Sequence, residues 1–142
     1  MCISKSYQKP VICSYWNIQG YKSKIVGNKL NDPEFQKIIS GSDIVGLAEL
    51  HADRELYIPG FKSVKQKTRE NFFKGPKIAG GIGVFVRNEI SHLVQVVPNK
   101  NKDSIWIKLR KNTIAESDDI YIGAYYGSPS KYKGDSTSDF FY

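Results

Sequence analysis

Hydrophobic runs of strand length alternate with short polar or glycine-containing breaks along most of this chain. The clearest alternation lies in residues 104–110, where Ile105, Ile107 and Leu109 share one face of an extended segment. The run Ile44–Leu50 is apolar on both faces, which indicates a buried strand. The full pattern predicts strands over residues 11–16, 44–50, 61–67, 80–86, 93–97, 104–110 and 120–126.

One helix has a clear beginning. Asp32-Pro33-Glu34 supplies an N-cap, a proline at the first helical position and an acidic first turn. Phe35, Ile38 and Ile39 then share one face, and Gly41 ends the helix. Two other segments are less regular: residues 23–30 predict a short helix or an ordered loop, and residues 87–89 predict a turn.

The order of elements is strand, helix, strand, and then a meander of strands. An α/β sandwich of mixed, largely antiparallel sheets fits this order better than a doubly wound parallel sheet, which needs a helix after each strand. The chain shows no internal repeat, low-complexity segment or interdomain linker. We therefore predict a tail over residues 1–10 and a single domain, or part of one, over residues 11–142.

Charge and cysteine content indicate the class of partner and the redox compartment. The net charge of +7 favours a polyanionic partner, either nucleic acid or an anionic membrane surface. No apolar run is long enough to span a bilayer and residues 1–10 lack the apolar core of a secretory signal, so we expect no membrane insertion. Cys2 and Cys13 do not make a disulfide framework. We expect Cys13 to be a buried thiol in a reducing compartment.

Basic residues concentrate in the stretch 62–77. This pattern is typical of a solvated, mobile loop. Phe72 and Phe73 also allow a loop that stacks on bases and contacts phosphates, or they could anchor the loop in the core. The candidate substrate-binding residues are Lys62, Lys65, Lys67, Arg69 and Lys74.

The candidate chemistry lies where two apolar runs end on side-chain oxygens. The run 11–16 ends on Asn17, and the run 44–48 ends on Glu49. Carboxylate and amide oxygens at neighbouring strand ends suit a hard divalent cation such as Mg²⁺, and a metal there suits phosphate-ester chemistry. Taken singly, Asn17 is equally typical of a turn, and Glu49 of a charge at a strand end in water.

Four segments carry a family resemblance: Tyr-Trp-Asn-Ile-Gln-Gly at 15–20, Leu-Ala-Glu-Leu-His at 47–51, Gly-Gly-Ile-Gly-Val-Phe-Val-Arg at 80–87 and Tyr-Gly-Ser-Pro at 126–129. In these segments the chain resembles the endonuclease/exonuclease/phosphatase superfamily. Within it, the chain is most similar to the endonuclease domain of non-LTR retrotransposon reverse transcriptases. The resemblance runs from Val11 to Tyr142 and covers only the N-terminal half of the family's domain. It implies a partial, truncated four-layer α/β sandwich whose sheets are flanked by helices.

The resemblance also assigns roles. It implies that Glu49 and Asn17 hold Mg²⁺ or Mn²⁺. Tyr126 is then the active-site tyrosine, with its hydroxyl on the scissile phosphate or the leaving oxygen. Strand alternation places Tyr125 and Tyr126 on opposite faces, so which of them faces the site stays open. His51 would orient a substrate phosphate or cap the loop.

The implied activity is Mg²⁺-dependent hydrolysis of DNA phosphodiesters by an endonuclease. The family's Asp-x-Asn and Ser-Asp-His-like segments have no counterpart here, so we expect an incomplete and inactive portion, prone to association through exposed sheet edges. The alternatives are a non-catalytic nucleic-acid-binding retrotransposon remnant and a lipid or inositol phosphatase of the same superfamily. DNA is the expected partner and no specific protein partner is predicted. An intracellular location, with the nucleus as one option, follows only from that substrate.

Overall fold

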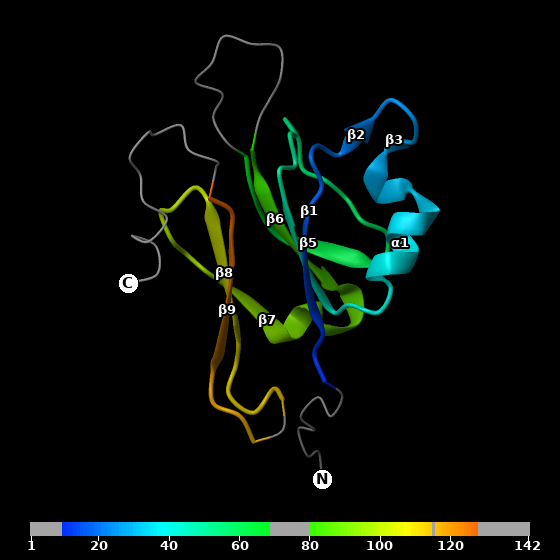
Figure 1. Ribbon diagram of the computed structural model, residues 1–142. Helices are drawn as coiled ribbons and strands as arrows, with labels where there is room; N and C mark the ends of the chain where they lie inside the picture. The colour runs from blue at the N-terminus through cyan, green and yellow to red at the C-terminus, as the bar shows by residue number, and fades with distance from the viewer. Residues whose placement is uncertain (1–9, 69–79, 115, 128–142) are drawn as a thin grey trace.

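The computed structural model describes residues 10–68, 80–114 and 116–127, and these residues form three layers (Figure 1). Helix α1 (Pro33–Ile39) lies against the outer face of a four-stranded sheet. The inner face of that sheet packs on a three-stranded sheet. The chain is therefore an α/β protein with one mixed and one antiparallel sheet, which confirms the fold class. Within the described residues no helix covers the outer face of the three-stranded sheet.

The four-stranded sheet has the strand order β1-β4-β6-β5. Its strands are β1 (Cys13–Asn17), β4 (Ile44–Ala48), β5 (Phe61–Lys67) and β6 (Ile82–Arg87). Strand β1 runs parallel to β4, and the other two pairs are antiparallel. Every residue of β4 is buried, as its sequence predicted.

The three-stranded sheet has the order β7-β8-β9 and is antiparallel throughout. Its strands are β7 (Val94–Val97), β8 (Ser104–Leu109) and β9 (Ile120–Tyr125). The predicted alternation in β8 is confirmed: Ile105, Ile107 and Leu109 are buried, while Trp106 is 42% exposed on the other face.

Two hydrophobic cores explain why β4 is apolar at every position. Val45 and Leu47 point into the core shared with Ile39 of α1, and Ile44 points into the core between the two sheets. Successive residues of a strand face opposite sides of its sheet, so a strand sandwiched between two cores has no position left for a polar side chain. The first position free to carry a charge is the one after the strand ends.

The less regular segments differ from their predictions. In residues 23–30, predicted as a short helix or an ordered loop, strands β2 (Lys22–Ser23) and β3 (Gly27–Asn28) make a small hairpin, and the 3₁₀ helix η1 (Lys29–Asn31) follows it. The predicted turn at 87–89 is the start of a longer 3₁₀ helix, η2 (Asn88–Leu93). In α1 only part of the predicted apolar face is covered, since Ile39 is buried and Ile38 is 58% exposed.

The prediction of a buried Cys13 is wrong. Cys13 is exposed because β1 lies at the edge of its sheet, not inside it. Partial burial still raises the pKa of its thiol, and the negative charge of Asp43 raises it further. The apolar run 11–16 predicted a strand correctly but carried no information on which strand would be at the edge.

A partly buried ionic network closes the end of the four-stranded sheet opposite to Asn17. The Asp43 carboxylate accepts hydrogen bonds from Arg87 Nε at 3.3 Å and from the backbone N–H of Ile12 at 2.9 Å. The same guanidinium donates to the carbonyl oxygens of Ser40 and Ser42 at 2.8 and 2.6 Å. One side chain thus satisfies three acceptors, which joins the end of α1 to strands β4 and β6.

We predict that Arg87→Met lowers the free energy of unfolding by about 2 kcal/mol, because it leaves a nearly buried carboxylate and two carbonyl oxygens without their donor. Urea unfolding followed by circular dichroism measures the change. The control is Arg110→Met, which removes the same charge from an exposed position and should change stability by less than about 0.5 kcal/mol. Equal effects of the two substitutions would contradict a role for this network.

Candidate metal and phosphate site

Three of the predicted site residues meet at one end of the sandwich. Asn17 is the last residue of β1 and is paired in register with Ala48, so Glu49 follows at the adjacent strand end. Tyr126 follows β9 in the other sheet, and its hydroxyl donates a hydrogen bond to Glu49 Oε1. The two parallel strands place Asn17 and Glu49 at the same sheet edge, and the tyrosine reaches them from the facing sheet.

The backbone of Glu49 explains how its carboxylate reaches the other sheet. By alternation from Leu47, which faces the helix side, Glu49 would also point toward the helix. Its φ of +52° interrupts the strand geometry, and its carboxylate meets Tyr126 on the inter-sheet side. A left-handed conformation at a non-glycine residue is uncommon, and strained residues of this kind cluster at functional sites.

Left-handed residues are concentrated at this end of the molecule. Gln19 and His51 have φ values of +52° and +49°. Gly20, Gly80 and Gly81 have φ values of +92°, +76° and +96°. They belong to the loops that surround Glu49, where the N–H of Gly20 donates to the Glu49 carbonyl at 2.6 Å. The loops are therefore tightly bonded to the segment that presents the carboxylate.

The surroundings of Asn17 are compatible with both interpretations of this residue, as a turn former and as a ligand of a cation. Its Oδ1 accepts a hydrogen bond from the backbone N–H of Gln19 at 3.1 Å, which makes it a turn-former. A carbonyl oxygen has two lone pairs, so this bond leaves Oδ1 able to accept another contact. The side chain is exposed at the strand end, where a cation or water can reach it.

His51 lies beside this group but takes no part in the contact between Glu49 and Tyr126. Its backbone N–H donates to the Gly80 carbonyl at 2.9 Å, and its residue is exposed. The imidazole packs directly on Gly20: a Cβ at that position would lie 3.1 Å from His51 Nδ1. Gly20 is thus needed both for its positive φ and for the approach of the ring.

The structure distinguishes the two neighbouring tyrosines. Tyr126 points inward, packs in the inter-sheet core and contacts Glu49, while Tyr125 is on the outer side of β9 and 40% exposed. The N–H of Tyr126 donates to the Asp103 carbonyl at 2.9 Å, which extends the pairing of β8 and β9 by one residue. Tyr126 is therefore the one of the two tyrosines whose hydroxyl contacts Glu49.

Tyr15 is a member of the site that the sequence did not single out. Its hydroxyl donates to the Tyr125 carbonyl at 2.9 Å, and its ring lies against Gly46, where a Cβ would come within 3.0 Å of Tyr15 Cδ2. Desolvation raises the pKa of Tyr15, and the nearby charge of Glu49 raises it further. The sequence contained one indication of this role: Tyr15 lies two residues before Asn17, so both side chains are on the same face of β1.

The candidate lysines of β5 fall into two groups. A bulge between Ser63 and Lys65 lets Lys62, Lys65 and Lys67 pair with Val86, Val84 and Ile82, so all three lysines start from the inter-sheet side of the strand. Lys62 and Lys65 are exposed and available to a ligand. Arg69 and Lys74 lie outside the described residues.

Lys67 is already engaged within the protein. Its ammonium donates to Asn99 O at 3.2 Å, Asn99 Oδ1 at 3.1 Å and Asn101 O at 2.7 Å. Desolvation, followed by the charge of Lys65, lowers its pKa. An ammonium has three donors, so Lys67 ties β5 to the loop before β8 and has little capacity left for substrate.

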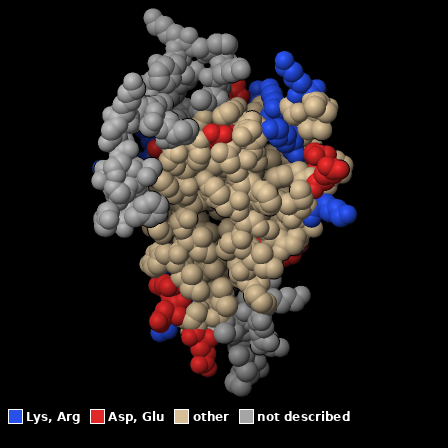
Figure 2. Space-filling view, viewed as in Figure 1, with Lys and Arg blue, Asp and Glu red and all other residues tan. Residues whose placement is uncertain are grey.

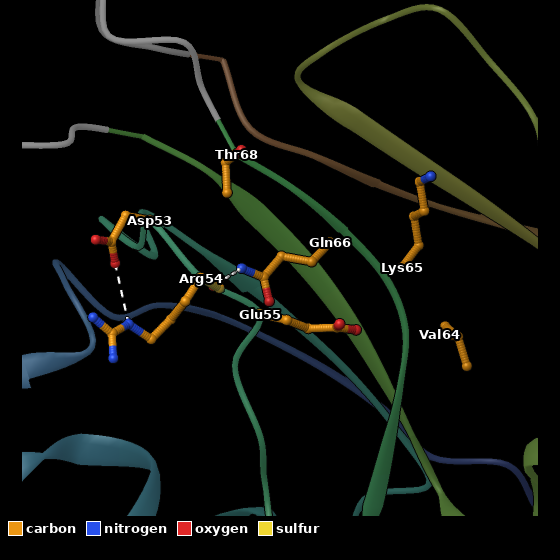
Figure 3. Close-up of a pocket in the computed structure, with 7 residues that line it drawn as sticks. All are labelled: Asp53, Arg54, Glu55, Val64, Lys65, Gln66 and Thr68. Atoms are coloured by element: carbon orange, nitrogen blue, oxygen red, sulfur yellow. Dashed lines mark hydrogen bonds and ion pairs between the residues drawn. The ribbon is translucent and has the colours of Figure 1, made fainter.

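A polar pocket of about 330 Å³ lies on β5 and on the loop that follows His51. Figure 3 shows Asp53, Arg54 and Gln66 gathered on one side of it. Arg54 Nε lies 3.2 Å from Asp53 Oδ1, and Gln66 bridges the loop by donating to Arg54 O and accepting from the Leu56 N–H. Asp53 and Arg54 pair with each other, and neither Glu49 nor Tyr126 lines the pocket, so we assign it no part in the candidate metal site.

The donors at the strand ends are of the kind that Mg²⁺ takes from proteins. Among the described residues, no group of three or more histidine, cysteine, aspartate and glutamate side chains comes together, as a zinc centre of protein ligands would need. One carboxylate and one amide oxygen match Mg²⁺, which keeps several waters and takes few protein ligands together with substrate phosphate. No lysine or arginine of the described part of the chain pairs with Glu49.

Comparison of the chain with family models, with curated proteins and with solved structures gave no match. The family relationship therefore stays a prediction from the four sequence segments. None of the helices in the described ranges has the length and hydrophobicity of a membrane-spanning segment. A proposal about function therefore rests on the geometry at the strand ends.

We predict that Glu49→Gln lowers the pKa of Tyr15, because it removes one of the two causes that raise it above 10.0. Ionisation of Tyr15 opposes folding: its contribution to stability is present below the pKa of the unfolded chain and is lost as pH rises through the folded value. Absorbance of tyrosinate against pH, with Tyr15→Phe to identify the signal, measures the midpoint. An unchanged Tyr15 midpoint in Glu49→Gln would show that the two groups do not interact.

Proposed function

We propose that this chain supplies the metal-holding part of a Mg²⁺-dependent phosphodiesterase that acts on DNA. The observation that carries the proposal is the contact between the Tyr126 hydroxyl and the Glu49 carboxylate, beside Asn17 at the neighbouring strand end. Three side chains singled out for one chemistry, from positions far apart in sequence, lie at one end of the sandwich. The net charge of +7 supports a polyanionic substrate.

Each residue has a defined task in this proposal. Glu49 and Asn17 hold Mg²⁺, which when bound stabilises negative charge on phosphate oxygens. Tyr126 orients the Glu49 carboxylate through its hydrogen bond, as outer-shell partners of metal ligands commonly do. When substrate is bound, this hydroxyl can donate its single proton to a phosphate oxygen in place of the Glu49 carboxylate.

The described residues do not complete a hydrolytic site. Hydrolysis needs a base to activate water, and the histidines of the described ranges do not supply one at Glu49. His51 is packed on Gly20, and His92 is an exposed residue of η2. We therefore expect the chain alone to bind metal and DNA without nicking DNA at a useful rate.

Removing the charge of the proposed ligand should weaken metal binding. We expect Glu49→Gln to weaken Mn²⁺ binding by more than about tenfold and Tyr126→Phe by about tenfold, as loss of a ligand and of its outer-shell partner. Titration of Mn²⁺ followed by electron paramagnetic resonance measures both.

The matched control is Glu55→Gln, an exposed glutamate with the same charge change, which should leave Mn²⁺ affinity unaltered. Equal Mn²⁺ binding by the wild type and by Glu49→Gln would refute the metal site. A plasmid assay tests the second part: Mg²⁺-dependent nicking that disappears in Glu49→Ala would show that the chain is active by itself.

A non-catalytic DNA-binding role is the second candidate, and the shared face of Lys62 and Lys65 favours it. We expect Lys65→Met to weaken DNA binding and to reduce its salt dependence by about one counterion. Lys67→Met changes the same charge but removes a lysine held by Asn99 and Asn101, so its salt dependence should stay that of the wild type. Fluorescence anisotropy over a range of salt concentrations measures both. Equal loss of salt dependence in the two variants would mean that Lys67 also contacts phosphate.

A further inference from the structure

The β2–β3 hairpin (residues 22–28) projects from the end of the molecule that holds Asn17 and Glu49 (Figure 1). Its base is bonded to the segment that carries the proposed metal ligand. The N–H of Tyr21 donates to the Leu50 carbonyl at 3.0 Å, directly after the bond from Gly20 to Glu49. Lys29, just beyond the hairpin, donates from Nζ to the Ile18 carbonyl at 2.7 Å. The hairpin therefore has a fixed position relative to the candidate site.

The tip of the hairpin presents apolar side chains to solvent. Ile25 is 93% exposed, the highest value among the large hydrophobic side chains of the described residues, and its neighbour Val26 is 48% exposed. Single exposed apolar residues are common on protein surfaces. Two adjacent ones at the end of a projecting hairpin form a small apolar tip that binding can bury.

The conformation of the tip is set before any ligand arrives. Ser23 Oγ accepts hydrogen bonds from the N–H groups of Ile25 and Val26 at 3.1 and 3.4 Å. Gly27 closes the turn with a φ of +71°, and a Cβ there would meet nothing within 4 Å, so only the backbone requires glycine. A tip that is already ordered loses less conformational entropy on binding.

The charged side chains of the hairpin itself are all basic. Lys22 and Lys24 are exposed, and residues 21–31 include no acidic side chain. Figure 2 shows basic side chains at this hairpin with acidic ones just below them, while the face formed by β1 and β9 is almost without charge. The hairpin thus combines an apolar tip with flanking cations. This combination suits a ligand whose outer surface is anionic and whose interior is apolar.

We propose that the β2–β3 hairpin is a DNA-contacting wedge, in which Ile25 inserts against the bases of a groove while Lys22 and Lys24 lie along the phosphates. Proteins that bend DNA use single apolar side chains in this way, and partial unstacking of one base step is enough. This inference rests on the proposed function for its choice of DNA. An anionic membrane has related chemistry, but two small aliphatic side chains bury too few methylene groups for lasting attachment.

A duplex that carries 2-aminopurine in place of adenine tests the wedge, because the fluorescence of this base rises when it is unstacked. We expect a rise with the wild type, and in Ile25→Gln no rise together with binding about fivefold weaker. The control is Ile38→Gln, the same change at a 58% exposed isoleucine on α1, which should behave as the wild type. Lys24→Gln should keep the fluorescence rise and lose about one counterion of salt dependence.

The titrations are run in EDTA and repeated with Glu49→Gln, so that the result does not depend on the metal site. If the fluorescence rise persists in both conditions but the wild type does not bind Mn²⁺, only the metal proposal is refuted. Identical behaviour of Ile25→Gln and Ile38→Gln on DNA would overturn the wedge. The same variants are mixed with vesicles of phosphatidylcholine and phosphatidylserine: binding that Ile25→Gln abolishes there, with no effect on DNA, would assign the hairpin to a membrane surface and also overturn it.

Discussion

Burial of β4 on both faces constrains the remainder of this molecule. A strand held between two cores must be apolar at every position, so its polar chemistry has to begin where the strand stops. Glu49 is that first position. Its neighbours follow from the pairing of β4: β1 brings Asn17 to the same edge, and the packing of the second sheet brings Tyr126 above it. The candidate site thus lies at the end of β4, where the requirement for apolar side chains no longer applies.

Much of this arrangement can be predicted from sequence, because it depends on local patterns. Apolar runs ending on Asn17 and Glu49 define both strands and both candidate ligands, and the clean alternation of 104–110 defines the inner face of β8. The choice between Tyr125 and Tyr126 depends on register, which requires the partner strand. The edge position of β1, which exposes Cys13, depends on strand order, and a single strand's sequence does not contain it.

Other features were unpredictable because they arise from long-range bonding. The ammonium of Lys67 is bound by Asn99 and Asn101, which lie more than thirty residues away in the sequence. The sequence alone therefore could not separate Lys67 from the lysines that remain available to bind phosphate. The left-handed turn at Glu49 has no signature in residue type, since glutamate rarely adopts it. Residues 23–30 contain a serine that bonds its own loop and a glycine at a positive φ, which are signals for a hairpin that hydrophobic periodicity does not detect.

The sequence separation of the contacts at the site affects when the site can form. The hydrogen bond from Tyr126 to Glu49 joins residues 77 positions apart, and that from Tyr15 to Tyr125 joins residues 110 positions apart. Closing such long loops costs chain entropy that is recovered only when both sheets are docked. The hairpin and the strands can form earlier from local contacts, but the pairing of carboxylate and phenol must come late in folding. Conversely, any opening that separates the two sheets breaks these contacts, so the local geometry of Tyr126 should report on the integrity of the whole sandwich.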